Sequence, residues 1–115
     1  MSMEIATRFI TLRESGEDTA ALALLTDNAT LGTVWGCING KEAIANYFKD
    51  EKRFTYLKKQ YGPLKQLDDS TCYRIAVIRR NMAEHMRIWA DPSYRETFFV
   101  KNNRVRLVIF EKFQL

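Results

Sequence analysis

The sequence predicts an α+β domain, in which three helices precede a meander of four or five antiparallel strands. Two observations carry this prediction. Apolar residues recur at helical spacing up to about residue 50, and from about residue 56 they alternate with polar residues at a period of two. Short turn sequences separate the alternating runs, and short connections make neighbouring strands antiparallel. An antiparallel sheet with its helices gathered on one face belongs to the α+β class.

The three helices are predicted from apolar stripes and from their end signals. The first helix ends near Ser15–Gly16, and its stripe consists of Ile5, Phe9 and Leu12. The second begins at the acidic pair Glu17–Asp18, whose charges suit a helix N-terminus, and ends at Asp27–Asn28. Its buried side is Ala21, Leu22 and Leu25. Residues 29–36 are expected to form a short strand. The third helix is capped by Asn39, with Glu42 three residues on as in a capping box, and its stripe is Ile44, Tyr47 and Phe48.

Four alternating runs are expected to be the long strands of the sheet. They cover residues 73–78, 84–89, 95–100 and 105–110. Asn102–Asn103, between the last two runs, suits a two-residue hairpin because asparagine tolerates the left-handed backbone conformation. The alternation leaves open which side of the second run faces the core: if Met86 and Ile88 do, His85 lies outside.

Composition limits the class of protein. The 115 residues are 46% hydrophobic and 28% charged, which predicts one globular domain over residues 1–115. The longest apolar run is shorter than the roughly 18 residues of a membrane helix. Glu4 and Arg8 exclude a signal peptide in the first ten residues, so we expect a cytoplasmic protein. Cys37 and Cys72 are then expected to be reduced thiols.

The net charge of +4 is unevenly divided along the chain. Residues 1–51 hold eight acids and four bases, whereas residues 52–115 hold fourteen bases and six acids. Such asymmetry suits a nucleic-acid or phosphate surface, and equally suits two faces that complement each other within a fold or across a dimer. Since the chain has no run of five bases, a solvated face is the simpler interpretation, and nucleic acid is not the expected partner.

Three segments resemble the nuclear-transport-factor-2-like (NTF2-like) superfamily, the cone-shaped fold that includes ketosteroid isomerase, scytalone dehydratase and the SnoaL-type polyketide cyclases. They are Thr26–Leu31, Asn39–Ile44 and Glu96–Val105, and the resemblance extends over nearly all of the chain. It implies three N-terminal helices packed on a strongly curved antiparallel sheet, with an apolar pocket at the wide end of the cone. It also implies a homodimer through the outer face of the sheet, to which we assign Arg74, Ile78, Val108 and Phe110.

The isomerase branch implies three catalytic groups, of which this chain matches one. The carboxylate base at the end of the first strand falls on Thr33. The pKa of a threonine hydroxyl is far above neutral pH, so the hydroxyl stays protonated and cannot act as the base. The tyrosine of the first helix is missing, because the aromatic residue there is Phe9. The second carboxylate, on the penultimate strand, matches Glu96. Steroid-isomerase chemistry is therefore not the leading interpretation.

His85 and Glu96 are the catalytic candidates for another metal-free isomerase, dehydratase or cyclase type of reaction. His85 is the single histidine, and imidazole exchanges protons near neutral pH. A carboxylate beside it would fix its tautomer. The residues expected to contact a small hydrophobic ligand are Trp35, Tyr47, Arg87, Trp89 and Phe98. The competing interpretation is structural: a lone histidine on a strand is commonly a satisfied surface group, and the aromatic residues also suit a core.

Metal and cofactor chemistry are not expected, because the cysteines and the histidine do not form a cluster with ligand spacing. Three functions then remain. The preferred one is a small-molecule pocket, which would be contradicted if Trp35, Phe98 and Phe9 filled the cavity. The alternative is a non-catalytic dimeric adaptor that uses the same fold for protein–protein contact. The third is nucleic-acid or phosphate binding by the basic second half, which predicts a steep salt dependence.

Overall fold

A computed structural model describes residues 2–33, 36–51, 57–80 and 93–112, with side chains except at 51, 57–59 and 78–80. The described elements are three helices and seven strands. The helices are α1 (Ser2–Glu14), α2 (Asp18–Ala23) and α3 (Lys41–Glu51). The strands are β1 (Leu25–Thr33), β2 (Gly36–Asn39), β3 (Leu57–Tyr61), β4 (Lys65–Asp68), β5 (Thr71–Arg80), β6 (Ser93–Lys101) and β7 (Arg104–Lys112).

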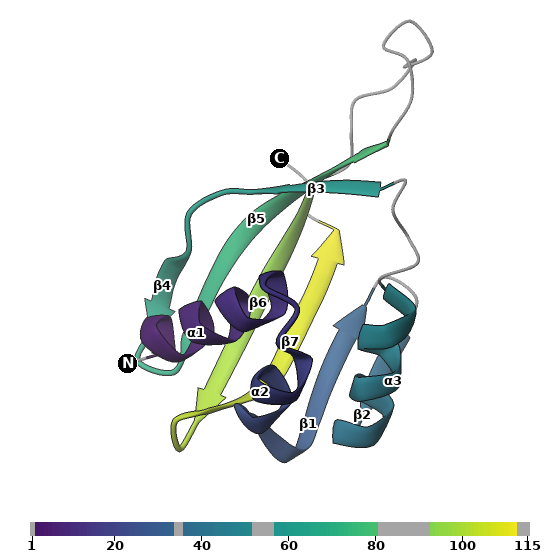
Figure 1. Cartoon of the computed structure of the whole chain (residues 1–115). Coiled ribbons are helices and arrows are strands. Elements are labelled where there is room, and N and C mark those ends of the chain that lie inside the picture. The colour runs from purple at the N-terminus through teal and green to yellow at the C-terminus, as the bar shows by residue number, and fades with distance from the viewer. Residues whose placement is uncertain (1, 34–35, 52–56, 81–92, 113–115) are drawn as a thin grey trace, which may run out of the picture.

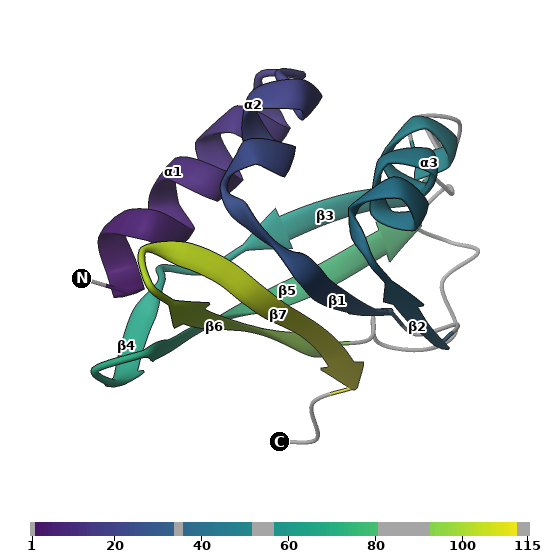
Figure 2. The ribbon, with the colours of Figure 1, turned by 90° about the horizontal axis from the view of Figure 1, so that it is seen from below.

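The strands form one curved sheet that carries the helices on its concave face (Figures 1 and 2). Their order is β2-β1-β7-β6-β5-β3, and β4 also pairs with β5. The predicted α+β class is confirmed, and β5, β6 and β7 are antiparallel neighbours in chain order, as predicted. β3 and β4 both pair with β5, and the predicted strand 84–89 lies outside the described residues. One pair differs: β1 runs parallel to β7. The first strand therefore lies alongside the last, and the sheet stays open, with β2 and β3 at the two ends of the strand order.

The core lies between the helices and the concave face. Phe9 of α1 is at its centre, with ring centroids 6.4 Å from Phe48 of α3 and 6.4 Å from Phe98 of β6. All three rings are buried, as are most residues of the predicted helix stripes. The remaining core residues are Ile5, Ala6, Ala21, Leu25, Ala29, Ile44, Cys72, Val105 and Val108.

Two turns near the helices differ from the sequence prediction. The second helix ends at Ala23, and Leu25 is buried as the first residue of β1 rather than as part of the helix. The predicted strand 29–36 is confirmed over residues 29–33, but β1 already begins at Leu25, and Gly36 belongs to a second strand that pairs antiparallel with it. Asn39 is the last residue of β2, where its Oδ1 accepts a hydrogen bond from Thr30 Oγ1 at 2.9 Å. Gly40, with φ at +86°, precedes α3, and its carbonyl accepts from the Ile44 amide at 3.0 Å. The predicted asparagine cap is therefore wrong.

The β6–β7 turn agrees with its prediction. Asn102 and Asn103 adopt φ angles of +53° and +61°, so both residues are left-handed, as a two-residue type I′ hairpin requires.

The residues assigned to the outer face of the sheet are on the wrong side. Val108 belongs to the core, Arg74 reaches Glu14 of α1, and Phe110 lies opposite Glu96. The side chain of Ile78 is outside the described set. The convex face instead carries the alternate residues of these strands, which include Tyr73, Ile75, Val77, Thr97, Phe99, Leu107 and Ile109. A shift of one residue exchanges the two faces of a strand. Because both faces of these strands carry apolar residues, the sequence pattern does not show which face meets the helices.

Candidate functional site

Glu96 projects from the concave face of β6 and forms an ion pair with Arg74 of β5. The register places the two residues directly opposite each other. Arg74 Nε donates to Glu96 Oε1 at 2.6 Å, and Arg74 is only 9% exposed. A charged pair removed from water in this way loses hydration that the ion pair must replace. The pair is thus a charged feature on a face that is otherwise built around an apolar core.

Three further side chains lie around the Arg74 guanidinium. The ring of Tyr61, at the end of β3, has its centroid 3.5 Å from Arg74 Cζ, within the range of a cation–π interaction. The Phe98 centroid is 5.9 Å away. Glu14, the last residue of α1, has its Oε1 atom 3.9 Å from Arg74 Nη1. The guanidinium is therefore held between two strands and a helix end.

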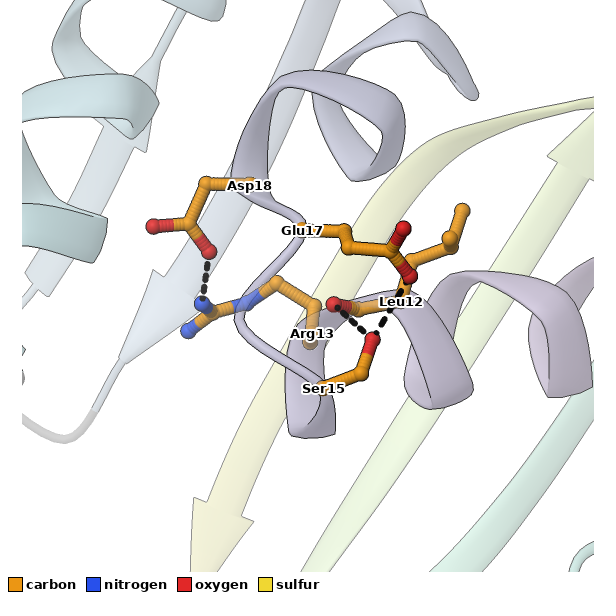
Figure 3. A network of polar contacts seen from close by, with 5 residues as sticks. All are labelled: Leu12, Arg13, Ser15, Glu17 and Asp18. Atoms are coloured by element: carbon orange, nitrogen blue, oxygen red, sulfur yellow. Dashed lines mark hydrogen bonds and ion pairs between the residues drawn. The ribbon is translucent and has the colours of Figure 1, made fainter.

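A second charged pair lies over the aromatic core, at the turn between α1 and α2 (Figure 3). Arg13 Cζ is 3.5 Å from the centroid of Phe48, and Arg13 Nη1 donates to Asp18 Oδ1 at 3.1 Å. The Ser15 hydroxyl lies 3.2 Å from the Leu12 carbonyl oxygen and 2.9 Å from Glu17 Oε2. These contacts close the turn and keep Asp18 next to Arg13. Two rings of the aromatic core thus each have an arginine nearby, Arg13 at Phe48 and Arg74 at Phe98.

Beyond Glu96, the concave face becomes aromatic again. Tyr94 and Phe110 stack with their ring centroids 4.9 Å apart and their planes 13° apart. Phe110 is directly opposite Glu96, and Tyr94 is two residues before it on β6. Along β6 the concave face therefore presents Phe98, then Glu96, then Tyr94, which is an apolar–charged–aromatic sequence.

Comparison with known proteins identifies the architecture. No protein-family model matches the chain, and neither does any curated protein. Solved structures do match. Bal32a, from a soil-derived mobile gene cassette, superposes with a TM-score of 0.76 at 21% identity, covering 98% of this chain and 89% of that one. An NTF2-like protein of unknown function from Cytophaga hutchinsonii gives 0.74 at 14%, covering 98% and 90%. The chain has the NTF2-like fold.

A candidate polyketide cyclase from Sinorhizobium meliloti is also similar, with a TM-score of 0.75 at 12% identity over 96% of this chain and 99% of that one. At these identities the likeness is one of fold. It confirms the fold that the NTF2-like resemblance implies. Within an NTF2-like fold, the concave face that carries Glu96 is the face turned toward the helices.

Three of the predicted site residues can be located in this NTF2-like fold. Glu96 and Phe98 share the concave face, as their common parity indicated. Phe98 is 1% exposed and packs edge-on against Phe9, so it is a core residue at the base of the concave face. Tyr47 of α3 is half-buried against the core. Trp35, His85, Arg87 and Trp89 lie outside the described residues, so their convergence with Glu96 stays a prediction.

Arg74 is the residue of this cluster that sequence reasoning placed on the wrong face. One signal could have located it. Cys72 and Ala76, which share its parity on β5, are both small, and both are completely buried. A strand face that alternates small residues with one arginine leaves room for a long side chain to lie along the concave surface.

Two open hollows lie at the other end of the strands, around the β6–β7 turn. The first, of about 360 Å³, is lined by Glu4, Ile5, Arg8 and Asn103. The second, of about 480 Å³, is lined by Thr26, Asp27, Asn28, Lys101, Asn102 and Arg104. Neither includes a predicted site residue. Within the described residues, no cluster of histidine, cysteine or carboxylate side chains could hold a metal ion, and no helix is long and apolar enough to span a membrane.

The two cysteines differ in their surroundings. Cys37 is exposed on β2, whereas Cys72 is completely buried on β5. Burial raises the pKa of the Cys72 thiol to about 11, and a hydrogen bond with Ser2 opposes this only in part. Cys72 Sγ lies 3.8 Å from the Ser2 carbonyl oxygen. Cys72 is therefore a protonated core residue at neutral pH rather than a nucleophile.

Proposed function

We propose that the concave face of this NTF2-like domain binds a small, largely apolar molecule beside Glu96. The observation that carries the proposal is the Arg74–Glu96 pair, which is mostly removed from water and faces the helices. Replacing such a pair by apolar residues is often neutral or stabilising, so a buried ion pair is weak support for a purely structural role. A charged pair between apolar surfaces is, however, typical of a binding pocket.

The aromatic neighbours of the pair support an apolar ligand. Tyr94 and Phe110 stack on the same face as Glu96, on the side away from the Phe9–Phe98 core. A flat, apolar molecule lying against these rings would bring its polar group to the carboxylate. Several proteins of the same fold are described as candidate polyketide cyclases, and cyclisation of a carbonyl compound needs a group that removes a proton from carbon.

The proposed reaction class is therefore a metal-free isomerisation, dehydration or cyclisation. Glu96 would accept the proton, because a positioned carboxylate can act as a general base. His85 would serve as the second proton carrier, and Trp35, Tyr47, Arg87 and Trp89 would contact the ligand, as the sequence predicts.

Nuclear magnetic resonance titration tests the binding site directly. The amide signals of the labelled protein are followed while small aromatic ketones are added. We expect the largest shifts at residues flanking Arg74, Glu96 and Tyr94, and weaker binding for Glu96→Gln. Lys101→Gln, in the hollow at the β6–β7 turn, is the matched control and should bind normally. Shifts confined to the β6–β7 turn, or binding indifferent to Glu96→Gln, would contradict the proposal.

A further inference from the structure

The hydrogen-bonding capacity of Arg74 is only partly used. A guanidinium has five N–H donors in one plane. Nε donates to Glu96 Oε1 at 2.6 Å. The nearest acceptor to Nη1 is Glu14 Oε1 at 3.9 Å, which is beyond hydrogen-bonding distance. The other contacts of the guanidinium are the ring faces of Tyr61 and Phe98. Among the described residues, the terminal Nη groups therefore donate no hydrogen bond.

The Nη groups lie at the border of the buried region and keep contact with solvent, since among the described residues the buried side-chain polar atoms without a hydrogen bond are Ser2 Oγ and Thr26 Oγ1. Arg74 is buried between strand β5 and the helices, whereas Glu14 is exposed at the end of α1. The fold thus holds the Nη donors in place, although their nearest acceptor, Glu14 Oε1, is 3.9 Å from Nη1.

Two contacts fix the orientation of those donors. The ion pair with Glu96 holds the Nε edge, and the Tyr61 ring lies against the guanidinium at 3.5 Å. Because Nε is occupied, an incoming group meets the Nη edge. A planar group with one or two oxygen atoms and a full or developing negative charge matches that edge best, since charge-assisted hydrogen bonds to guanidinium are strong and directional.

We propose that Arg74 selects the ligand: its Nη groups bind a planar oxygen anion, as in a carboxylate, an enolate or a phenolate, on an otherwise apolar molecule. This inference rests on the proposed function and specifies its ligand class. Arg74 then has two roles, since Nε positions Glu96 and the Nη groups contact the ligand. The apolar part of the ligand lies against Tyr94 and Phe110.

Matched acids and alcohols test the inference. Isothermal titration calorimetry compares benzoate with benzyl alcohol, and naphthoate with naphthylmethanol, on the full chain at neutral pH. Each pair has the same ring and differs in the oxygen group. We expect the acid of at least one pair to bind the unmodified protein about 10- to 100-fold more tightly than its alcohol, as a charge-assisted hydrogen bond provides.

Three variants separate the roles of the positive charge of Arg74, of the planar arrangement of its N–H donors, and of the neighbouring carboxylate of Glu14. Arg74→Lys keeps the positive charge but lacks the planar guanidinium, so it should lose most of the preference for the acid. Arg74→Gln combined with Glu96→Gln avoids an unpaired buried charge, so it should fold and bind acid and alcohol equally. Glu14→Gln removes a negative charge near Nη1 and should tighten acid binding by about two- to five-fold. Circular dichroism checks the fold of each variant.

The outcomes distinguish this inference from the proposed function. If acids and alcohols bind alike, or if the double variant keeps the preference for the acid, Arg74 does not select the ligand although the concave face still binds one. If the probes do not bind the unmodified protein at all, both proposals are overturned together.

Discussion

The ring of Tyr61 lies 3.5 Å from the guanidinium carbon of Arg74, so the end of β3 covers a charge that belongs to β5. The strand register explains the contact. Tyr61 is paired with Ala76, which is two residues beyond Arg74 on the same face.

The cation–π contact between Arg74 and Tyr61 needs an aromatic ring, so Tyr61→Phe should keep it and Tyr61→Leu should lose it. We expect Tyr61→Leu to lower the free energy of unfolding by about 1 kcal/mol more than Tyr61→Phe, measured by urea denaturation. Equal losses for the two variants would contradict a cation–π role.

The Arg74–Glu96 pair should be coupled energetically. Arg74→Met leaves a carboxylate without its cation in a mostly buried position, so we expect it to cost about 3 kcal/mol. Glu96→Leu should cost a similar amount, because it leaves the guanidinium without its closest acceptor. The double variant removes both charges and should cost clearly less than the two single changes together. A double-mutant cycle by urea denaturation measures this coupling, and strictly additive losses would show that the pair does not act as a unit.

The core was predictable because its residues stand at fixed spacing. The stripes that contain Phe9 and Phe48 follow the helical period, and these rings do meet in the core. The Asn102–Asn103 turn follows from the backbone preferences of asparagine. Such local signals require no knowledge of the rest of the chain, so a single sequence is sufficient to read them.

The faces of the sheet were not predictable in the same way. Strands β5 to β7 carry apolar residues on both sides, so alternation cannot tell which side meets the helices, and Arg74 and Val108 were assigned to the wrong face. The parallel pairing of β1 with β7 joins Leu25 to Val105, and no local pattern specifies so distant a partner. Glu96 was predictable because the family resemblance indicated its position. Arg74 could be recognised as part of the site only from its contacts in the folded structure.

Phe9 should be one of the most sensitive positions for stability. Its ring contacts both Phe48 and Phe98, so truncation leaves a cavity between α1, α3 and the sheet. We expect Phe9→Ala to lower the free energy of unfolding by about 3–5 kcal/mol. Thr7→Ala, at an exposed position of the same helix, is the control and should change it by less than about 0.5 kcal/mol. Similar effects for the two variants in thermal or urea unfolding would be inconsistent with the observed core.

The Cys72 thiol should make stability fall in alkaline solution. Burial raises the pKa of this thiol from 9.0 to about 11. The unfolded chain therefore loses the proton first, and the folded state binds more protons between these two values. By linkage, the stabilising contribution is complete below pH 9 and is lost as pH rises from 9 through 11. We expect unfolding free energies measured across this interval to decline more steeply for the unmodified protein than for Cys72→Ala.

The same thiol should resist alkylation. In native protein at pH 8, iodoacetamide should modify Cys37, which is exposed, and leave Cys72 unmodified. In denaturant both cysteines should react, and mass spectrometry counts the added groups. Rapid modification of Cys72 in the folded protein would contradict its complete burial.

We propose, finally, that two copies of the chain associate through the convex face. Apolar side chains lie on three adjoining strands there: Tyr73 of β5 and Ile109 of β7 flank the buried Thr97 of β6. Contiguous apolar surface of this kind marks an interaction site. Light scattering should then give a particle of about twice 13.5 kDa. Ile109→Glu, at the centre of the face, should halve that mass, whereas Leu67→Glu, which changes an exposed leucine on β4, should not. A monomer at high micromolar concentration, or equal effects of the two variants, would contradict association through this face.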